Sequence, residues 1–226
     1  MTSAPPGADP LQLVVCGTDT DVGKTVVSAL LVQGLQAQYW KPVQSGLEQG
    51  GDRQWLTQLL QLPQQRWIPE AYAFQAPVSP HWAAEQENCC IDPDQLSLPS
   101  TTEPLVVETA GGVMVPLSRN WLQIEQLERW KLPIVLVGRS GLGTLNHTLL
   151  TLEALRRRGL TVHGLVLNGP AHADNPHTLE QLGGVPVLAQ LPPLNPLTAE
   201  SLDQQWRQQQ LGPRFEALHS SRSTCP

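Results

Sequence analysis

The fold of this chain follows from one loop sequence, Gly17-Thr18-Asp19-Thr20-Asp21-Val22-Gly23-Lys24-Thr25. An apolar run over residues 11–16 precedes the loop and another over residues 26–35 follows it, which predicts a strand, a loop and a helix in that order. Because a helix N-terminus presents unpaired backbone N–H groups and a partial positive charge, it is suited to bind an anion. The sequence therefore predicts a phosphate-binding loop.

The last three residues of this loop have the properties that a triphosphate site needs. Gly23 lets the backbone approach a phosphate, Lys24 can reach the β- and γ-phosphates, and the Thr25 hydroxyl can ligate Mg²⁺. The pattern G-x-x-x-x-G-K-[ST] places its first glycine where this chain has Thr18, while Gly17 stands one residue earlier. The strand before the loop and the helix after it still favour a site for a nucleoside triphosphate.

The composition narrows the class of protein. Of 226 residues, 40% are apolar and 15% charged, and the formal net charge is −6, as in a soluble globular protein. No basic stripe accompanies this acidic balance, so a nucleic-acid partner is not expected. The four cysteines form no C-x-x-C pair, which favours reduced thiols and a cytoplasmic location. No apolar stretch is long enough to span a membrane, and residues 1–10 are expected to form a flexible lead without a signal peptide.

Apolar strands alternate with helical segments along the rest of the chain. Six prolines within residues 63–103 predict a loop-rich excursion there, not a separate domain. Since strands that are apolar throughout must be covered on both faces, the pattern predicts a single α/β domain over residues 11–226, with a three-layer α/β/α fold and a mostly parallel sheet. Strands are predicted over residues 11–17, 39–43, 104–108, 133–138, 162–168 and 185–189, and helices over residues 23–37, 52–62, 144–158, 174–182 and 198–210.

Candidate site residues follow the predicted strands. In a parallel sheet, ligands bind outside the carboxyl ends of the strands, so residues at these positions are expected to meet on one edge. The segments concerned are the loop 17–25, residues 41–45, Glu108, residues 138–144 and Asn168.

Six sequence motifs, taken in order, resemble those of the dethiobiotin synthetase family. They are G-T-D-T-D-V-G-K-T (17–25), K-P-V-Q-S-G (41–46), S-P-H (79–81), E-T-A-G-G (108–112), G-L-G-T-L-N-H-T-L-L-T (141–151) and Asn168 after a strand. The resemblance implies a P-loop NTPase-like fold and an ATP- and Mg²⁺-dependent ligase that closes a ureido ring on 7,8-diaminononanoate with CO₂ in biotin synthesis. It also implies a homodimer.

The chemistry of that family requires positive charge. One amine of the substrate captures CO₂ as a carbamate, ATP phosphorylates the carbamate, and the second amine closes the ring and expels phosphate. The carbamate and the γ-phosphate are both anions, so cations have to lie around them in a partly dehydrated site. By the resemblance, Lys41 is the catalytic lysine and Lys24 supplies further catalytic charge. The alternative for Lys41 is a strand-end lysine exposed to solvent.

The resemblance also implies the contacts with ATP, Mg²⁺ and the diamine. Thr25, Asp52 and Glu108 match the Mg²⁺ ligands, which suits a cation that prefers oxygen, although Asp52 also lies where a helix N-cap is expected. The expected nucleotide contacts are Asp21, Val22, Gly23, Lys24, Thr25, Val26, Asp52, Glu108, Thr109, Ala110, Gly111, Asn168, Gly169, Pro192, Pro193 and Leu194, with Asn168 reading the adenine. The expected substrate contacts are Thr20 and Ser45, together with Gly143, Thr144 and Asn146 at a helix start that holds the carboxylate tail across the dimer interface.

Thr109 departs from the family pattern, which commonly has E-G-A-G-G at this place. If the backbone here needs a positive φ to bring its N–H groups to a phosphate, a β-branched residue is unfavourable. The substitution affects the contact expected from Thr109 and leaves that of Glu108 unchanged.

A nucleotide-switched ATPase of the partitioning or iron-protein type is the main alternative, because those proteins share this architecture. They carry a second lysine five residues before the lysine of G-K-T, where this chain has Asp19. The sequence therefore favours the ligase.

Overall fold

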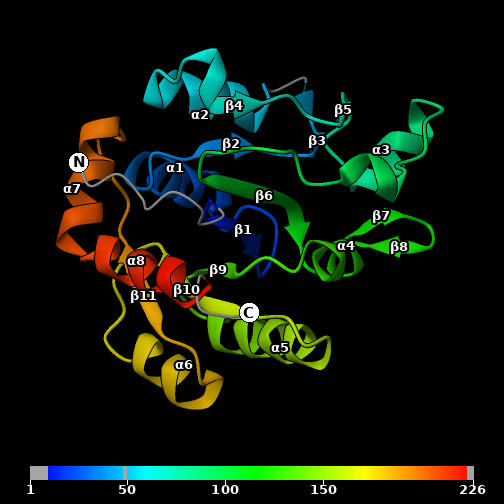
Figure 1. Ribbon diagram of the computed structural model, residues 1–226. Coiled ribbons are helices and arrows are strands. Elements are labelled where there is room, and N and C mark those ends of the chain that lie inside the picture. The colour runs from blue at the N-terminus through cyan, green and yellow to red at the C-terminus, as the bar shows by residue number, and fades with distance from the viewer. Residues whose placement is uncertain (1–9, 48–49, 223–226) are drawn as a thin grey trace.

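One parallel sheet forms the centre of the molecule (Figure 1). The computed structural model describes residues 10–47 and 50–222, so most of the lead predicted for residues 1–10 lies outside the described residues. All neighbouring strands of this sheet are parallel, which confirms the prediction. The strand order is β11 (Val187–Leu191), β10 (Val162–Asn168), β9 (Ile134–Arg139), β1 (Gln12–Gly17), β6 (Leu105–Gly112), β2 (Gln38–Trp40) and β4 (Trp67–Ile68).

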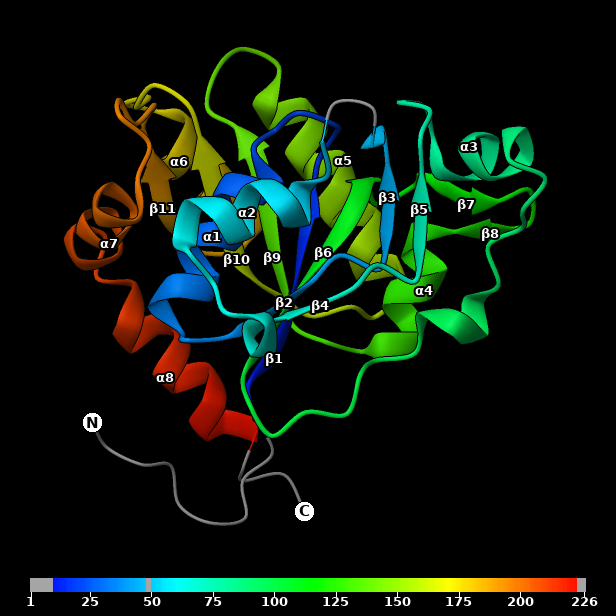
Figure 2. The same cartoon turned by 90° about the horizontal axis from the view of Figure 1, so that it is seen from above.

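Helices cover both faces of this sheet, as Figures 1 and 2 show. Side chains of β1 alternate between two buried clusters, with Leu13 in one and Val14 in the other, which explains why the strand is apolar throughout. The layers confirm the predicted α/β/α fold, and no helix in the described residues is both long and apolar enough to cross a membrane. One layer holds α1 (Lys24–Gly34), α2 (Asp52–Leu60), α7 (Ala199–Gln208) and α8 (Leu211–Arg222), and the other holds α4 (Gln123–Trp130), α5 (Thr144–Arg157) and α6 (Asn175–Gly183).

The strand predicted over residues 39–43 is divided in two. β2 ends at Trp40, and β3 (Val43–Ser45) pairs instead with β5 (Tyr72–Phe74) in a separate two-stranded sheet. Pro42 lies between them and has no N–H to donate to a ladder, while its carbonyl oxygen accepts from the Tyr72 N–H at 2.9 Å. The single strand predicted here is therefore wrong, and the break leaves residues 41 and 42 at the edge of the main sheet.

The proline-rich segment 63–103 contains more regular structure than a loop-rich excursion suggests. β4 adds a parallel edge strand to the main sheet, and the preceding 3₁₀ turn (Gln64–Arg66) fixes it because the Arg66 guanidinium donates to the Ala37 carbonyl oxygen at 2.9 Å. The helix α3 (Pro80–Gln86) and a second 3₁₀ turn (Pro93–Leu96) each begin at a proline, which is well tolerated at the first position of a helix.

Two helices lie where the sequence predicted no element. α4 follows the antiparallel pair β7 (Pro116–Ser118) and β8 (Trp121–Leu122), and its Glu125 carboxylate accepts from the Leu122 backbone N–H at 2.6 Å. α8 follows α7, so the helix predicted over residues 198–210 is not the last one. Few apolar residues mark α8 in the sequence, yet Leu211 and Phe215 are buried in the core.

Candidate active site

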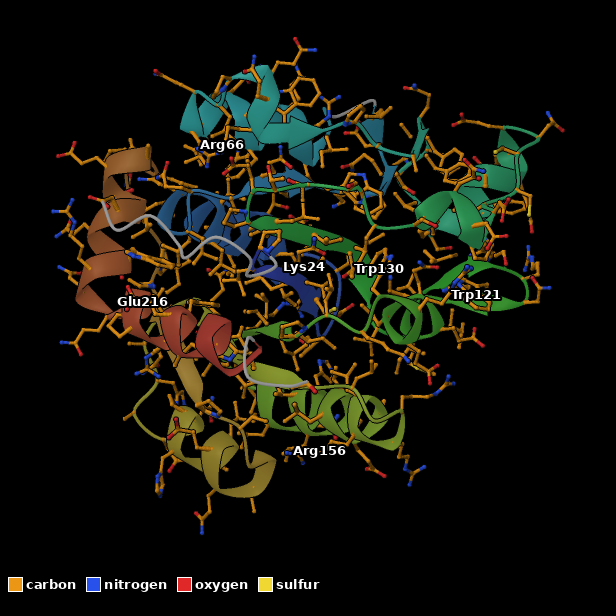
Figure 3. The ribbon with its side chains drawn as sticks, in the orientation of Figure 1. Lys24, Arg66, Trp121, Trp130, Arg156 and Glu216 are labelled. Atoms are coloured by element: carbon orange, nitrogen blue, oxygen red, sulfur yellow. The ribbon has the colours of Figure 1, made fainter. Side chains whose placement is uncertain are left out.

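The loop between β1 and α1 has the backbone shape of a phosphate-binding loop. Gly23 caps α1 with a left-handed backbone, φ 93°, which favours glycine. Lys24 opens the helix and is buried, and its Nζ donates to the Asp19 carbonyl oxygen at 3.0 Å. Burial lowers the pKa of Lys24, although the Glu108 carboxylate opposes this shift. Figure 3 shows Lys24 in the middle of the molecule, next to the central strands.

Four predicted site residues converge behind this loop. Lys41 Nζ lies 3.1 Å from Glu108 Oε1 and also pairs with Asp52 Oδ2. The Thr25 hydroxyl oxygen lies 3.0 Å from Asp52 Oδ1 and 3.0 Å from Glu108 Oε1. Glu108 is fully buried and Lys41 nearly so, which means that these charges compensate one another without much help from water. The alternative of a solvent-exposed Lys41 is therefore wrong.

The pKa values of Lys41 and Asp52 favour their ionised forms. Burial acts against the charge of Lys41, but Glu108 and Asp52 outweigh it and raise the pKa of the ammonium group. Burial also acts against the Asp52 carboxylate, but the ammonium group of Lys41 outweighs it and lowers the pKa of Asp52. At neutral pH, Lys41 is therefore a cation and Asp52 an anion.

Asp52 is the first residue of α2 and not its N-cap. Gly51 occupies the cap position in an extended conformation. The Asp52 backbone N–H donates to Gln44 Oε1 at 3.0 Å, and Gln44 Nε2 donates to the Ser45 carbonyl oxygen at 2.7 Å. The N-cap interpretation is therefore wrong, and the buried amide of Gln44 supports Asp52 in a way that the sequence did not indicate.

Tyr39 is a second neighbour of the cluster that the sequence did not single out. Its side chain is fully buried, and its hydroxyl donates to Glu108 Oε2 at 2.9 Å. Burial, followed by the nearby Glu108 carboxylate, raises the pKa of Tyr39 well above its ordinary value, so the phenol stays a donor. Its position two residues before Lys41 was the only signal in the sequence.

A cavity of about 1030 Å³ opens in front of the cluster. This is the size of a small-molecule site. Ser45 Oγ, at its wall, is buried and has no hydrogen-bond partner among the described residues, so it is available to a ligand. The predicted site residues that line the cavity are Thr20, Asp21, Gly23, Lys24, Thr25, Val26, Lys41, Ser45, Asp52, Glu108, Ala110 and Gly111.

Two predicted nucleotide contacts turn their side chains into the protein. Val22 is packed in the core below α1. The Thr109 hydroxyl donates to the Val15 carbonyl oxygen on the neighbouring strand at 3.3 Å. Thr109 lies within β6, which runs past Glu108, and it is Gly111 that takes a left-handed backbone with φ 61°. The strain expected for a β-branched residue at this place does not arise, and only the backbone groups of Val22 and Thr109 can face a nucleotide.

The residues expected to hold the adenine follow β10 and β11. Asn168 Nδ2 donates to the Val22 carbonyl oxygen at 3.1 Å, which places it against the phosphate-binding loop. The Gly169 N–H donates to the Leu191 carbonyl oxygen at 2.9 Å, so the ends of the two strands lie together. The segment Pro192, Pro193 and Leu194 comes directly after this contact. These residues share the edge of the sheet with the cluster but lie outside the wall of the cavity.

The residues expected to hold the carboxylate tail begin α5. Gly143 caps the helix with φ 90°, and Asn146 is exposed. Thr144 is buried, and its hydroxyl oxygen lies 3.4 Å from Thr148 Oγ1. Thr144 can therefore reach a ligand only through its backbone, as a site at a helix start requires.

The donor set of the cluster fits a hydrated magnesium ion bound to a triphosphate. Thr25, Asp52 and Glu108 provide a hydroxyl and two carboxylates, which are the oxygen ligands that Mg²⁺ prefers. A magnesium ion keeps several of its waters, so one hydroxyl and two carboxylates are a sufficient contribution from the protein. Lys24 and the backbone at Gly23 fit the phosphates.

The parallel sheet, the left-handed Gly23 and the buried Lys24 define a P-loop nucleotide-binding protein. A family model described as an AAA domain matches residues 11–201. The chain is 47% identical over 192 residues to the ATP-dependent dethiobiotin synthetase BioD of Afipia carboxidovorans, and the match covers 84% of this chain and 91% of that protein. The chain belongs to the ATP-dependent dethiobiotin synthetase family. The resemblance seen in the motifs is thereby confirmed.

Two further comparisons show how far the similarity extends. The chain is 49% identical over 216 residues to the biotin biosynthesis bifunctional protein BioCD of Bordetella avium, which covers 95% of this chain but only 46% of that protein. The chain thus spans about half the length of this bifunctional relative. The solved structure of pNOB8 ParA bound to nonspecific DNA aligns over 95% of this chain and 98% of that chain, with a TM-score of 0.53 and 12% identity. This likeness shows the fold alone.

Proposed function

We propose that this chain is an ATP- and Mg²⁺-dependent cyclo-ligase that converts 7,8-diaminononanoate and CO₂ to dethiobiotin, with release of ADP and phosphate, in biotin biosynthesis. The observation that carries the proposal is the arrangement of two buried cations, Lys24 and Lys41, with the Asp52 and Glu108 carboxylates at the wall of one cavity. Membership of the family supports the same activity.

The reaction joins two anions. The carbamate oxygen attacks the γ-phosphorus of ATP and ADP leaves, which gives a carbamic-phosphoric anhydride. The second amine then attacks the carbonyl carbon, and the bond to the phosphate oxygen breaks. The ammonium groups of Lys41 and Lys24 reduce the repulsion between the reactants and stabilise the charge that develops between them. Because its pKa is raised, Lys41 acts through its charge and not as a proton acceptor.

The remaining roles follow from the geometry around the cavity. Thr25, Asp52 and Glu108 would hold Mg²⁺, which when bound offsets the negative charge of the phosphates. Ser45 Oγ, which is buried without a partner in the described residues, would bind a substrate nitrogen, and Thr20 would lie close to the carbamate. The edge formed by Asn168, Gly169 and residues 192–194 would hold the adenine.

The direct test supplies the chain with 7,8-diaminononanoate, bicarbonate, Mg²⁺ and ATP. We expect ADP and phosphate in equal amounts, together with a cyclic urea product of the mass of dethiobiotin. Omission of the diamine should stop the release of ADP, because the phosphorylated group is a carbamate of the substrate. Release of ADP without diamine, and without a urea product, would contradict the ligase and favour a nucleotide-switched ATPase.

The homodimer forms part of the proposal. The tail of the diamine would bind at the start of α5 in the neighbouring subunit, and exposed apolar side chains beside this helix support such a contact. Leu142 is fully exposed, Leu150 is 58% exposed, and Met114 is 54% exposed. Leu150 and Met114 line one surface hollow of about 400 Å³.

We expect Leu150→Arg to give a monomer that binds ATP normally but binds the diamine at least about tenfold more weakly, because one half of the tail site is lost. Light scattering gives the mass, and calorimetry gives the two affinities. Leu182→Arg changes another exposed leucine, on α6, and should remain a dimer with unchanged diamine binding. A fully active monomer would contradict the shared site.

We also propose that the chain forms a single domain and works in the cytoplasm. One sheet joins both helix layers, and Phe215 of α8 is buried in the core, which supports a single domain over residues 11–226. The three cysteines in the described part of the chain, Cys16, Cys89 and Cys90, form no disulfide there, which supports a reducing cytoplasmic location.

A further inference from the structure

Both oxygens of the Glu108 carboxylate contact side chains from β2 or from the residues just after it. Tyr39 lies in β2 and Lys41 follows that strand, so the two side chains, two residues apart, lie on the same face. The Lys41 ammonium group contacts Oε1 of Glu108 at 3.1 Å, and the Tyr39 hydroxyl donates to Oε2 at 2.9 Å. The two oxygens of this fully buried carboxylate therefore have different partners.

Only one of these oxygens faces the other site residues. Oε1 lies 3.0 Å from the Thr25 hydroxyl oxygen and close to Lys41, whereas Oε2 points toward the core around Tyr39. Tyr39 pairs with Val106 in the neighbouring strand, and Glu108 lies two residues further along the same face. A phenol has the length to reach this diagonal neighbour, and its uncharged donor leaves the negative charge of the carboxylate intact.

We infer that Tyr39 is a positioning residue, whose hydroxyl fixes the rotation of the Glu108 carboxylate so that Oε1 is presented to the magnesium ion. The inference rests on the proposed role of Glu108 as a magnesium ligand. A carboxylate held at one oxygen binds a cation through the other, so the carboxylate itself does not have to rotate when the cation arrives. Residues that hydrogen-bond to a metal ligand commonly change the affinity of the site for the metal.

The variant Tyr39→Phe removes the hydroxyl and keeps the ring. We expect the dissociation constant for Mn²⁺, used as a paramagnetic probe in the presence of ADP, to rise about tenfold or more. Electron paramagnetic resonance of free Mn²⁺ measures this without turnover. The Mg²⁺ concentration for half-maximal activity should rise in parallel, whereas ADP affinity in the presence of a chelator should not change.

Tyr72→Phe is the matched control, because its hydroxyl accepts from the Asp92 N–H at 3.0 Å outside the cluster. It should bind Mn²⁺ as the original chain does. If the phenol of Tyr39 merely fills the core, Tyr39→Phe will lower the melting temperature and leave Mn²⁺ affinity unchanged, which would overturn the inference. If Glu108→Gln also leaves Mn²⁺ affinity unchanged, the proposed role of Glu108 fails as well, so the two failures can be told apart.

A second measurement keeps the buried hydroxyl of Tyr39, which Tyr39→Phe removes. The chain has two tyrosines, so 3-fluorotyrosine incorporated into Tyr72→Phe labels Tyr39 alone. Addition of Mg²⁺ to the ADP complex should shift its fluorine resonance, because a cation at Oε1 of Glu108 changes the hydrogen bond at Oε2. If the fluorine resonance does not shift on saturation with Mg²⁺, Tyr39 does not sense the metal site, and the inference is contradicted.

Discussion

Replacement of Lys41 by alanine is expected to lower turnover by about a hundredfold to a thousandfold, since the lost ammonium group acts where charge develops between the reactants. ATP affinity should stay within about threefold of its original value, because the phosphate-binding loop and Lys24 remain. Steady-state kinetics and calorimetry with a slowly hydrolysed ATP analogue measure the two quantities. Turnover equal to that of the original chain would remove Lys41 from the mechanism.

A control has to separate this effect from loss of stability, because Lys41→Ala also leaves the buried carboxylate of Glu108 without its cation. Arg53→Ala removes another cation of the same region, whose guanidinium pairs with Glu70 at 2.9 Å and does not line the cavity. This control should lower the melting temperature and leave turnover within about threefold. Lys41→Arg keeps the charge and should retain more activity than Lys41→Ala at the same stability.

Replacement of Gly23 by alanine should reduce ATP affinity by about a hundredfold or more, which corresponds to about 3 kcal/mol. A Cβ atom at Gly23 would lie 2.0 Å from Asn168 Nδ2, so the side chain expected to read adenine would have to leave its place. The left-handed backbone alone adds strain of about 1 to 2 kcal/mol for a residue with a Cβ. Nucleotide binding by calorimetry and the melting temperature together measure the change.

Gly159→Ala is a control that measures the effect of a Cβ atom on a left-handed backbone without a close contact. Gly159 also has a left-handed backbone, φ 66°, but a Cβ atom there would meet nothing within 4 Å. The control should lose stability like any alanine in this conformation and bind ATP as before. If both variants bind ATP equally well, the close approach of Asn168 to the loop has no part in nucleotide binding.

The main features of the fold and site could be predicted because their signals are local. Gly23, Lys24 and Thr25 stand next to one another between an apolar strand and an apolar helix, so a short window is sufficient. Lys41 follows a short apolar segment and Glu108 ends another. The geometry of a parallel sheet brings such positions to one edge. The contact between them at 3.1 Å confirms that expectation.

The supporting residues could not be predicted, because their roles depend on contacts distant in sequence. Tyr39 in a short apolar strand has the pattern of a core residue, and its partner Glu108 becomes visible only when β2 lies beside β6. Gln44 follows Pro42, whose missing N–H divides the predicted strand and allows the next residues to bend toward α2. The helix α8 was missed because few apolar side chains anchor it.

The position of β1 in the sheet also has a consequence for how the protein is made. β1 precedes the other strands of the described residues, yet Gln12 pairs with Leu105 and Val14 with Ile134. One edge of this apolar strand therefore waits for its partner until β6 has been synthesised and the other until β9 has been synthesised, and such distant pairings form slowly. A nascent chain that ends before β9 contains the sequence of the phosphate-binding loop but lacks one of the two strands that pair with β1.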